Sequence, residues 1–120
     1  MADSKIQRPL PTRRWYSVLT STTLTTTDTV YNTFNGRKFS DYDVLIFTVG
    51  NTGDDIRNSI IIPTSIWVSN RRLVFTVFHG EGSVDKTNFT IAYNSDTSIK
   101  AYNGLSATIK ILNIYGGKIV

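Results

Sequence analysis

Cysteine is absent from the 120 residues of this chain, and histidine occurs only once. Without cysteine the protein can form neither a disulfide nor a thiolate metal site, and it has no cysteine nucleophile. No apolar run approaches the ~20 residues that a membrane-spanning helix needs. The N-terminal residues carry charge with no apolar segment behind it, so they do not predict a secretory signal. These absences predict a protein made in a cytoplasm, not exported by the general route and not inserted in a membrane.

Residues suited to catalysis are equally scarce. His79 is the single histidine, and neither a G-x-S-x-G elbow nor a Ser/His/Asp order accompanies it, so no triad is predicted. Asp41 and Asp43 are two apart on a predicted strand and would share a face, whereas a glycosidase needs two carboxylates across a cleft. We expect that Asp41 ends a turn and that Asp43 pairs with a base or caps a loop. The chain is therefore predicted to be non-enzymatic and to need no cofactor.

Sites for metal ions and nucleic acids are not predicted either. Asp54 and Asp55 could offer oxygen ligands to calcium from a Gly/Asn loop, but the EF-hand spacing is missing. The net charge is +4, of which residues 1–14 contribute +3 through four basic side chains and one acidic one. A nucleic-acid-binding body is expected to carry its own basic stripe. Residues 15–120 do not, so neither a metal nor a nucleic acid is an expected partner.

The clearest structural signal is the apolar segment at residues 44–49, between the turn formers Ser40 and Asp41 and the glycine at position 50. Its β-branched and aromatic residues predict a strand. Because side chains alternate along a strand, residues 45, 47 and 49 would face one side, and Val44 and Ile46 the other. Both faces are apolar. The segment therefore predicts a central strand at a core or a subunit contact, and residues 73–78 show the same two-sided pattern.

Seven or eight such short segments follow one another, separated by turn signals and without helical periodicity. This pattern predicts an all-β fold, a jelly-roll-like antiparallel β-sandwich that spans residues 15–120 as a single domain. The other expected strands are residues 15–20, 59–62, 65–69, 88–93 and 105–111. The expected core or interface residues are Leu45, Phe47, Val49, Trp67, Phe75, Ile109 and Ile111.

Turn residues define the ends of several strands. Asn35-Gly36 predicts a hairpin, because both residues tolerate positive φ. Pro63 interrupts the strands at 59–62 and 65–69, and suggests a bulge or an edge position. Residues 115–118, with two glycines, are expected to end the last strand.

Residues 1–14 form an extended, basic, proline-containing arm without any period of two or 3.6. Two interpretations remain open. The arm is a disordered terminus, or it docks on a neighbouring subunit or another virion protein, with its arginines paired to acidic groups there. The candidate docking residues are Ile6, Arg8, Pro9, Leu10, Pro11, Arg13 and Arg14.

A second group of residues is a candidate for surface recognition. Arg71 and Arg72 follow a predicted tight turn, where they keep an edge strand soluble or grip an acidic saccharide or phosphate. Tyr93, Tyr102 and Asn103 lie near predicted turns, where an exposed aromatic ring can stack on a sugar or a partner. Packing in the core or in an interface is the alternative for these three residues.

The opening Asp41-Tyr42-Asp43 of the central strand and the ending with Ile114, Tyr115, Gly116 and Lys118 resemble C-terminal β-sandwich domains of tailed-bacteriophage tail fibres and related virion proteins. The resemblance implies a trimer whose tips bind host-surface glycans or proteins, or a sandwich that decorates a capsid or tail tube. No shaft repeat or coiled coil precedes the sandwich, which favours a small virion component anchored by its arm, or an excised tip domain with its own initiating Met1.

Taken together, these features predict a non-enzymatic phage virion protein, made in the host bacterial cytoplasm. It would form a homo-oligomer, expected to be a trimer, that attaches to the particle through its arm and contacts the host surface. Two alternatives stay open. The first is a decoration protein that stabilises the virion without recognising a host, and the second is a lectin-like carbohydrate-binding module unrelated to phage.

Overall fold

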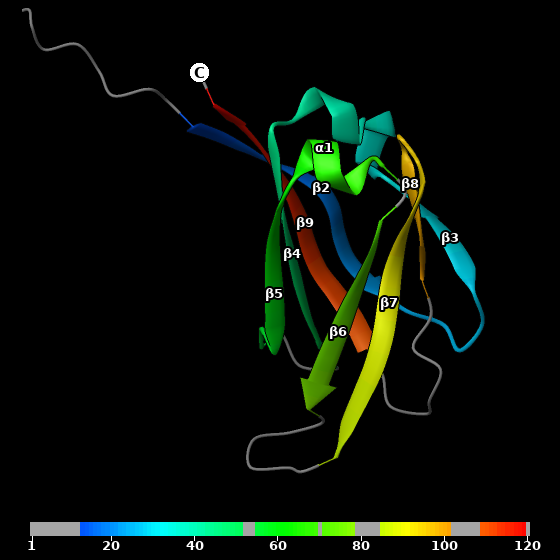
Figure 1. Ribbon diagram of the computed structural model, residues 1–120. Helices are drawn as coiled ribbons and strands as arrows, with labels where there is room; N and C mark the ends of the chain where they lie inside the picture. The colour runs from blue at the N-terminus through cyan, green and yellow to red at the C-terminus, as the bar shows by residue number, and fades with distance from the viewer. Residues whose placement is uncertain (1–12, 52–54, 70, 79–84, 102–108, 120) are drawn as a thin grey trace, which may run out of the picture.

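The computed structural model describes residues 13–51, 55–69, 71–78, 85–101 and 109–119. Its strands form two four-stranded antiparallel sheets, ordered β2-β9-β4-β5 and β3-β8-β7-β6. Figure 1 shows the two sheets facing each other as the layers of a sandwich. The prediction of an all-β antiparallel sandwich with seven or eight strands is confirmed.

The first sheet, which we call sheet I, has β2 and β5 at its edges and the long strand β9 beside β4 at its centre. Its strands are β2 (Arg13–Thr23), β9 (Ile109–Ile119), β4 (Val44–Asn51) and β5 (Asn58–Pro63). Sheet II consists of β3 (Thr29–Asn32), β8 (Ser98–Ala101), β7 (Lys86–Ser95) and β6 (Arg72–Phe78). Three short helical turns connect strands: η1 (Phe34–Gly36), η2 (Phe39–Asp41) and α1 (Thr64–Trp67).

The core lies between the two sheets and is built from alternate residues of each strand. β4 pairs with β5 on one side and β9 on the other, as expected for the central strand of residues 44–49. The residues predicted to lie in the core or in an interface lie in the core of the single chain. All of them are fully buried: Leu45, Phe47, Val49, Trp67, Phe75, Ile109 and Ile111.

Trp67 reaches the core from a helical turn and not from a strand, so the prediction of a strand at residues 65–69 is wrong. Pro63 ends β5, and the Val68 N–H donates to the Thr64 carbonyl at 2.9 Å. The Ser69 hydroxyl donates to the Ser65 carbonyl at 2.8 Å, which stabilises the turn further. These local hydrogen bonds override the alternating apolar pattern, because serine readily bonds to nearby backbone groups.

The segment at residues 73–78 forms β6, but only one of its faces is covered. Leu73, Phe75 and Val77 are buried, whereas Val74 is 65% exposed and Phe78 is 45% exposed. β6 is an edge strand of sheet II, and no other described strand covers its outer face. A two-sided apolar pattern therefore identified both strands, but it did not predict a covered outer face: Val44 and Ile46 of β4 are only half-buried, and Val74 of β6 is exposed.

The last strand continues through the two glycines that were expected to end it. Gly116 and Gly117 lie within β9, which runs to Ile119 because β2 and β4 pair with it on both sides. The rings of Tyr42 and Trp15 lie against these glycines, where a Cβ atom would come within 2.4 Å and 2.5 Å of ring carbons. The glycines thus allow close packing and do not form a turn.

Two further boundaries differ from the sequence prediction. β2 begins at Arg13 and pairs Arg13 with Ile119 and Arg14 with Lys118, so both arginines belong to the sheet and not to the arm. A register shift after Ser17 also interrupts the alternation expected for residues 15–20. The remaining arm residues (Ile6, Arg8, Pro9, Leu10 and Pro11) lie outside the described residues.

Asn35 and Gly36 adopt positive φ values of 51° and 67°, as expected from their residue types. The predicted hairpin is nevertheless wrong, because the flanking strands lie in different sheets. β3 pairs with β8, whereas β4 pairs with β5 and β9. The Asn-Gly turn therefore carries the chain from one layer of the sandwich to the other.

Candidate functional site

The two aspartates considered for catalysis have separate structural surroundings. Asp41 ends the η2 turn and is exposed, so it is not on a strand beside Asp43. The Asp43 carboxylate accepts a hydrogen bond from the Ile119 N–H at 2.7 Å, and the Asp43 N–H donates to the Gly117 carbonyl at 2.8 Å. Asp43 therefore fixes the end of β9, which is a strand and not the loop that it was expected to cap.

Other candidates for chemistry are dispersed or lie outside the described residues. His79 and Asp54 belong to the second group, and Asp55 pairs with Arg57 at the surface with an N–O distance of 3.4 Å. Within the described ranges, no three acidic, histidine or cysteine side chains gather where they could hold a metal ion. The same residues contain no helix long and apolar enough to cross a membrane.

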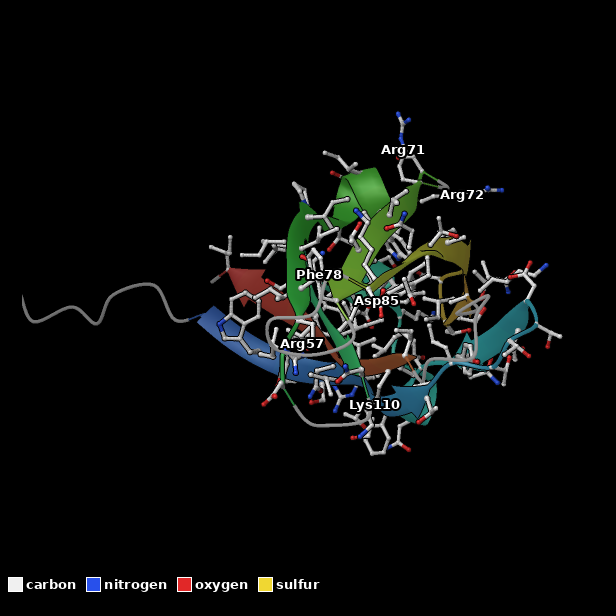
Figure 2. The ribbon with its side chains drawn as sticks, turned by 90° about the horizontal axis from the view of Figure 1, so that it is seen from below. Arg57, Arg71, Arg72, Phe78, Asp85 and Lys110 are labelled. Carbon is white, nitrogen blue, oxygen red and sulfur yellow. The ribbon has the colours of Figure 1, made fainter. Side chains whose placement is uncertain are left out.

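The residues predicted for surface recognition divide into two groups. Arg71 and Arg72 are exposed at the start of β6, and Figure 2 shows both side chains extending away from the body of the sandwich. The Tyr93 N–H donates to the Arg71 carbonyl at 3.4 Å, which ties this corner to β7. Tyr102 and Asn103 lie outside the described residues.

Tyr93 is a packing residue more than a surface residue. Its ring meets that of Trp67 edge-on with 5.9 Å between the centroids, and lies 6.2 Å from the ring of Phe39. Burial raises the pKa of the Tyr93 hydroxyl above 10.0, and the nearby negative charge of Asp96 raises it further. Of the two roles left open for Tyr93, the structure thus supports core packing.

Ionisation of Tyr93 should make the fold less stable at alkaline pH. A tyrosine in the unfolded chain has a pKa of about 10, and the folded protein holds Tyr93 neutral beyond this value. The unfolded state then loses its proton first, so the free energy of unfolding falls as pH rises above ~10. A difference titration of the native protein and Tyr93→Phe by ultraviolet absorbance should give a midpoint above 10. The variant should also lose less stability between pH 9 and 11, and a midpoint at or below 10 would contradict the prediction.

The outer face of sheet I carries an apolar hollow, which is the candidate functional site of the described structure. It has a volume of about 270 Å³ and crosses all four strands of the sheet. Three of its side chains are well exposed: Trp15 at 44%, Ile61 at 68% and Ile119 at 59%. The full lining is Trp15, Val44, Ile46, Ile61, Gly117, Lys118 and Ile119.

The register of the strands explains why these residues meet. Gly117 pairs with Trp15 on one side and with Val44 on the other, and Ile46 pairs with Ile61. Since Leu45 and Phe47 face the core, Val44 and Ile46 must face outward. The glycine has no side chain, so the Trp15 ring lies directly on the backbone and forms one wall of the hollow.

Sequence reasoning found half of this site. The second apolar face of residues 44–49 was expected to be covered, but the residues named for an interface were the inward ones. Trp15, Ile61 and Ile119 were missed because only the strand register brings them beside Val44 and Ile46. The one signal for Ile61 was the run of three isoleucines before Pro63.

The surface also has a polar hollow of about 320 Å³. Asp43, which lines this polar hollow, directly precedes Val44, which lines the apolar one. Its lining is Ser40, Tyr42, Asp43, Thr64, Ser65 and Val68. Its polar groups are partly engaged, because the Ser40 hydroxyl donates to Asp96 at 2.5 Å and the Tyr42 hydroxyl accepts from Arg37 at 3.2 Å. The two hollows meet where the Asp43 carboxylate accepts the Ile119 N–H.

The arrangement is suited to binding. An apolar hollow with an exposed aromatic wall and charged groups at its border has the composition of a protein-contact surface. Lys118 supplies one border charge and Asp43 the other. No family model matches this chain, and no curated protein or solved structure matches it significantly.

Proposed function

We propose that this protein is a non-enzymatic structural component of a bacteriophage virion, which self-associates through the outer face of sheet I and presents its loops to the host surface. The observation that carries the proposal is the apolar hollow. Monomeric soluble proteins rarely leave a large contiguous apolar patch open to water, and such patches usually mark an interaction site. Closed symmetric oligomers are the commonest way to cover a patch of this kind.

The resemblance to virion sandwiches supports the choice of a phage particle. The two motifs that carry it are in contact, because Tyr42 packs on Gly116 and the Asp43 carboxylate accepts the Ile119 N–H. The strand opening and the chain ending thus form one structural unit at the border of the hollow. In the resembling domains a trimer is common, and we extend that expectation to this chain.

Host contact is assigned to the corner that carries Arg71 and Arg72. Both arginines are exposed, and the backbone beneath them is tied to β7 through the Tyr93 N–H. A guanidinium group binds carboxylates and phosphates in a bidentate manner, which suits the acidic saccharides of a bacterial surface. Three copies in one oligomer would multiply the effect of individually weak contacts.

Binding of the labelled protein to a glycan array and to bacterial cells tests host contact. The double variant Arg71→Ala/Arg72→Ala should lower binding at least tenfold. Lys38→Ala/Lys86→Ala is a charge-matched control, because it removes two exposed basic side chains elsewhere, and it should bind like the native protein. If the native protein binds neither glycans nor cells, host contact is wrong and the decoration function is favoured.

Electron microscopy of phage particles that carry a tagged copy tests the virion assignment separately. The label should appear at symmetric positions on the tail or the capsid. Particles that assemble without any label would contradict the assignment. Binding of a defined glycan together with unlabelled particles would favour the lectin-like module.

A further inference from the structure

We propose that the apolar hollow on sheet I binds the N-terminal arm of a neighbouring copy, so that the oligomer is built by arm exchange. The arm is the segment 1–12, which precedes the first described strand. The inference rests on the proposed self-association and specifies which segment fills the hollow. Three observations carry it: the place where the arm joins the sheet, the composition of the arm and the chemistry of the hollow.

The arm joins the sheet at the border of the hollow. Arg13, the first residue of β2, pairs with Ile119, and Arg14 pairs with Lys118. Ile119 and Lys118 both line the hollow. Figure 1 shows the start of β2 and the end of β9 lying together at one corner of the sandwich. In an oligomer whose copies meet at this corner, each arm therefore begins close to the hollow of its neighbour.

The arm is long enough to reach and cross that hollow. Twelve residues in an extended conformation span up to roughly 40 Å. The four strands of sheet I are about 4.8 Å apart, so crossing the sheet takes roughly 15 Å, or about five extended residues. About seven residues then remain to connect the two copies, which is ample for subunits in direct contact.

The composition of the arm matches the hollow. Ile6 and Leu10 are apolar, and Pro9 and Pro11 have no N–H group that would lose its hydrogen bond to water in an apolar site. Proline-containing segments commonly dock against exposed aromatic rings, because their backbone is already extended and loses little entropy on binding. Trp15, 44% exposed at the wall of the hollow, is such a ring.

The charges of the arm are complementary to the Asp43 carboxylate beside the hollow. The arm carries Lys5 and Arg8, and the border of the hollow next to Val44 carries the exposed carboxylate of Asp43. An arginine paired with this carboxylate would fix the direction of the bound arm. Lys118 lies on the neighbouring strand β9, where it also lines the hollow. A basic segment is therefore expected to cross the hollow with its charged residues directed towards Asp43.

A neighbouring copy is favoured over the chain's own hollow. To fold back over its own sheet, the chain would have to reverse between the arm and Arg13. Proline disfavours the helical region for the residue before it, so Arg8 and Leu10 are expected to be extended or to enter a turn. A return over the chain's own sheet therefore needs a tight turn just before Arg13, whereas an arm that continues in the direction of β2 reaches a second copy without one.

Light scattering and sedimentation at micromolar concentration test the exchange with four proteins: the full chain, a chain without residues 1–12, Ile61→Asp and Val74→Asp. The full chain should be an oligomer, and both the shortened chain and Ile61→Asp should be monomers. Val74→Asp is the matched control, since Val74 is 65% exposed on sheet II and Ile61 is 68% exposed on sheet I. It should remain an oligomer, and circular dichroism should show the same strand content in all four.

A synthetic peptide of residues 1–12 tests the hollow directly. It should bind the shortened chain and change the fluorescence of Trp15, and Ile61→Asp in that chain should weaken binding at least tenfold. A monomeric full chain would overturn both the self-association and the arm exchange. A shortened chain that is still an oligomer, or a peptide that binds the shortened chain with and without Ile61→Asp equally, would overturn the arm exchange alone.

Discussion

Trp67→Ala should lower the free energy of unfolding by about 3–5 kcal/mol, the usual cost of truncating a fully buried aromatic residue. Trp67 is the largest of the fully buried side chains, and its ring lies 5.0 Å from that of Phe47 and 5.8 Å from that of Phe39. It joins α1 to strands of both sheets. Removal would leave a cavity that the flanking strands cannot close, because their backbones are fixed by sheet pairing. Urea unfolding followed by circular dichroism measures the loss.

The chain contains a natural control for this substitution, because its only other tryptophan is at the surface. Trp15→Ala removes the same side chain from a position that is 44% exposed and should cost about 1 kcal/mol. The stability loss of Trp67→Phe should lie between those of Trp15→Ala and Trp67→Ala. The buried indole N–H has no hydrogen-bond partner among the described residues, so its removal breaks no hydrogen bond. Equal losses for Trp15→Ala and Trp67→Ala would show that Trp67 is not at the centre of the core.

The fold could be predicted from the sequence because the period-two pattern is strong in the central strands. β4 has an apolar core face at residues 45, 47 and 49, and β9 buries residues 109 and 111 with the same period before a register shift at Leu112 moves the next buried position to 114. Such a segment can be recognised as a strand from its own sequence, without knowledge of which strands pair with it or in which register. Trp67 was placed on a strand because Ile66, Trp67 and Val68 resemble one, and hydrogen bonds around Ser69 outweighed this local preference.

The candidate site was harder to predict, because it depends on pairing between distant segments. Ile61 is beside Ile46 only in the observed register, and a shift by one residue would move it to the other face. The glycines of β9 were interpreted as a turn for a similar reason. Glycine both ends strands and allows close packing, and the rings that decide between the two roles come from Trp15 and Tyr42.

Gly116→Ala should destabilise the fold by about 1–3 kcal/mol, the cost of overpacking a filled site. A Cβ atom at this position would lie 2.4–2.6 Å from three carbons of the Tyr42 ring. The ring cannot easily retreat. Tyr42 is only 6% exposed, the ring of Tyr16 lies 5.8 Å away, and Arg37 donates a hydrogen bond to the Tyr42 hydroxyl at 3.2 Å. Urea unfolding measures this change as well.

Gly117→Ala is the matched comparison, because it adds the same methyl group at the next position of the same strand. Its Cβ atom would meet the Trp15 ring at 2.5 Å, but that ring is at the surface and can swing outward. The cost should therefore be below about 1 kcal/mol, within the range of surface substitutions. Adding Tyr42→Ala to Gly116→Ala should recover about 1 kcal/mol relative to the sum of the single changes, since the double variant removes the clash. Additive losses would show that the Tyr42 ring is not what excludes a side chain at Gly116.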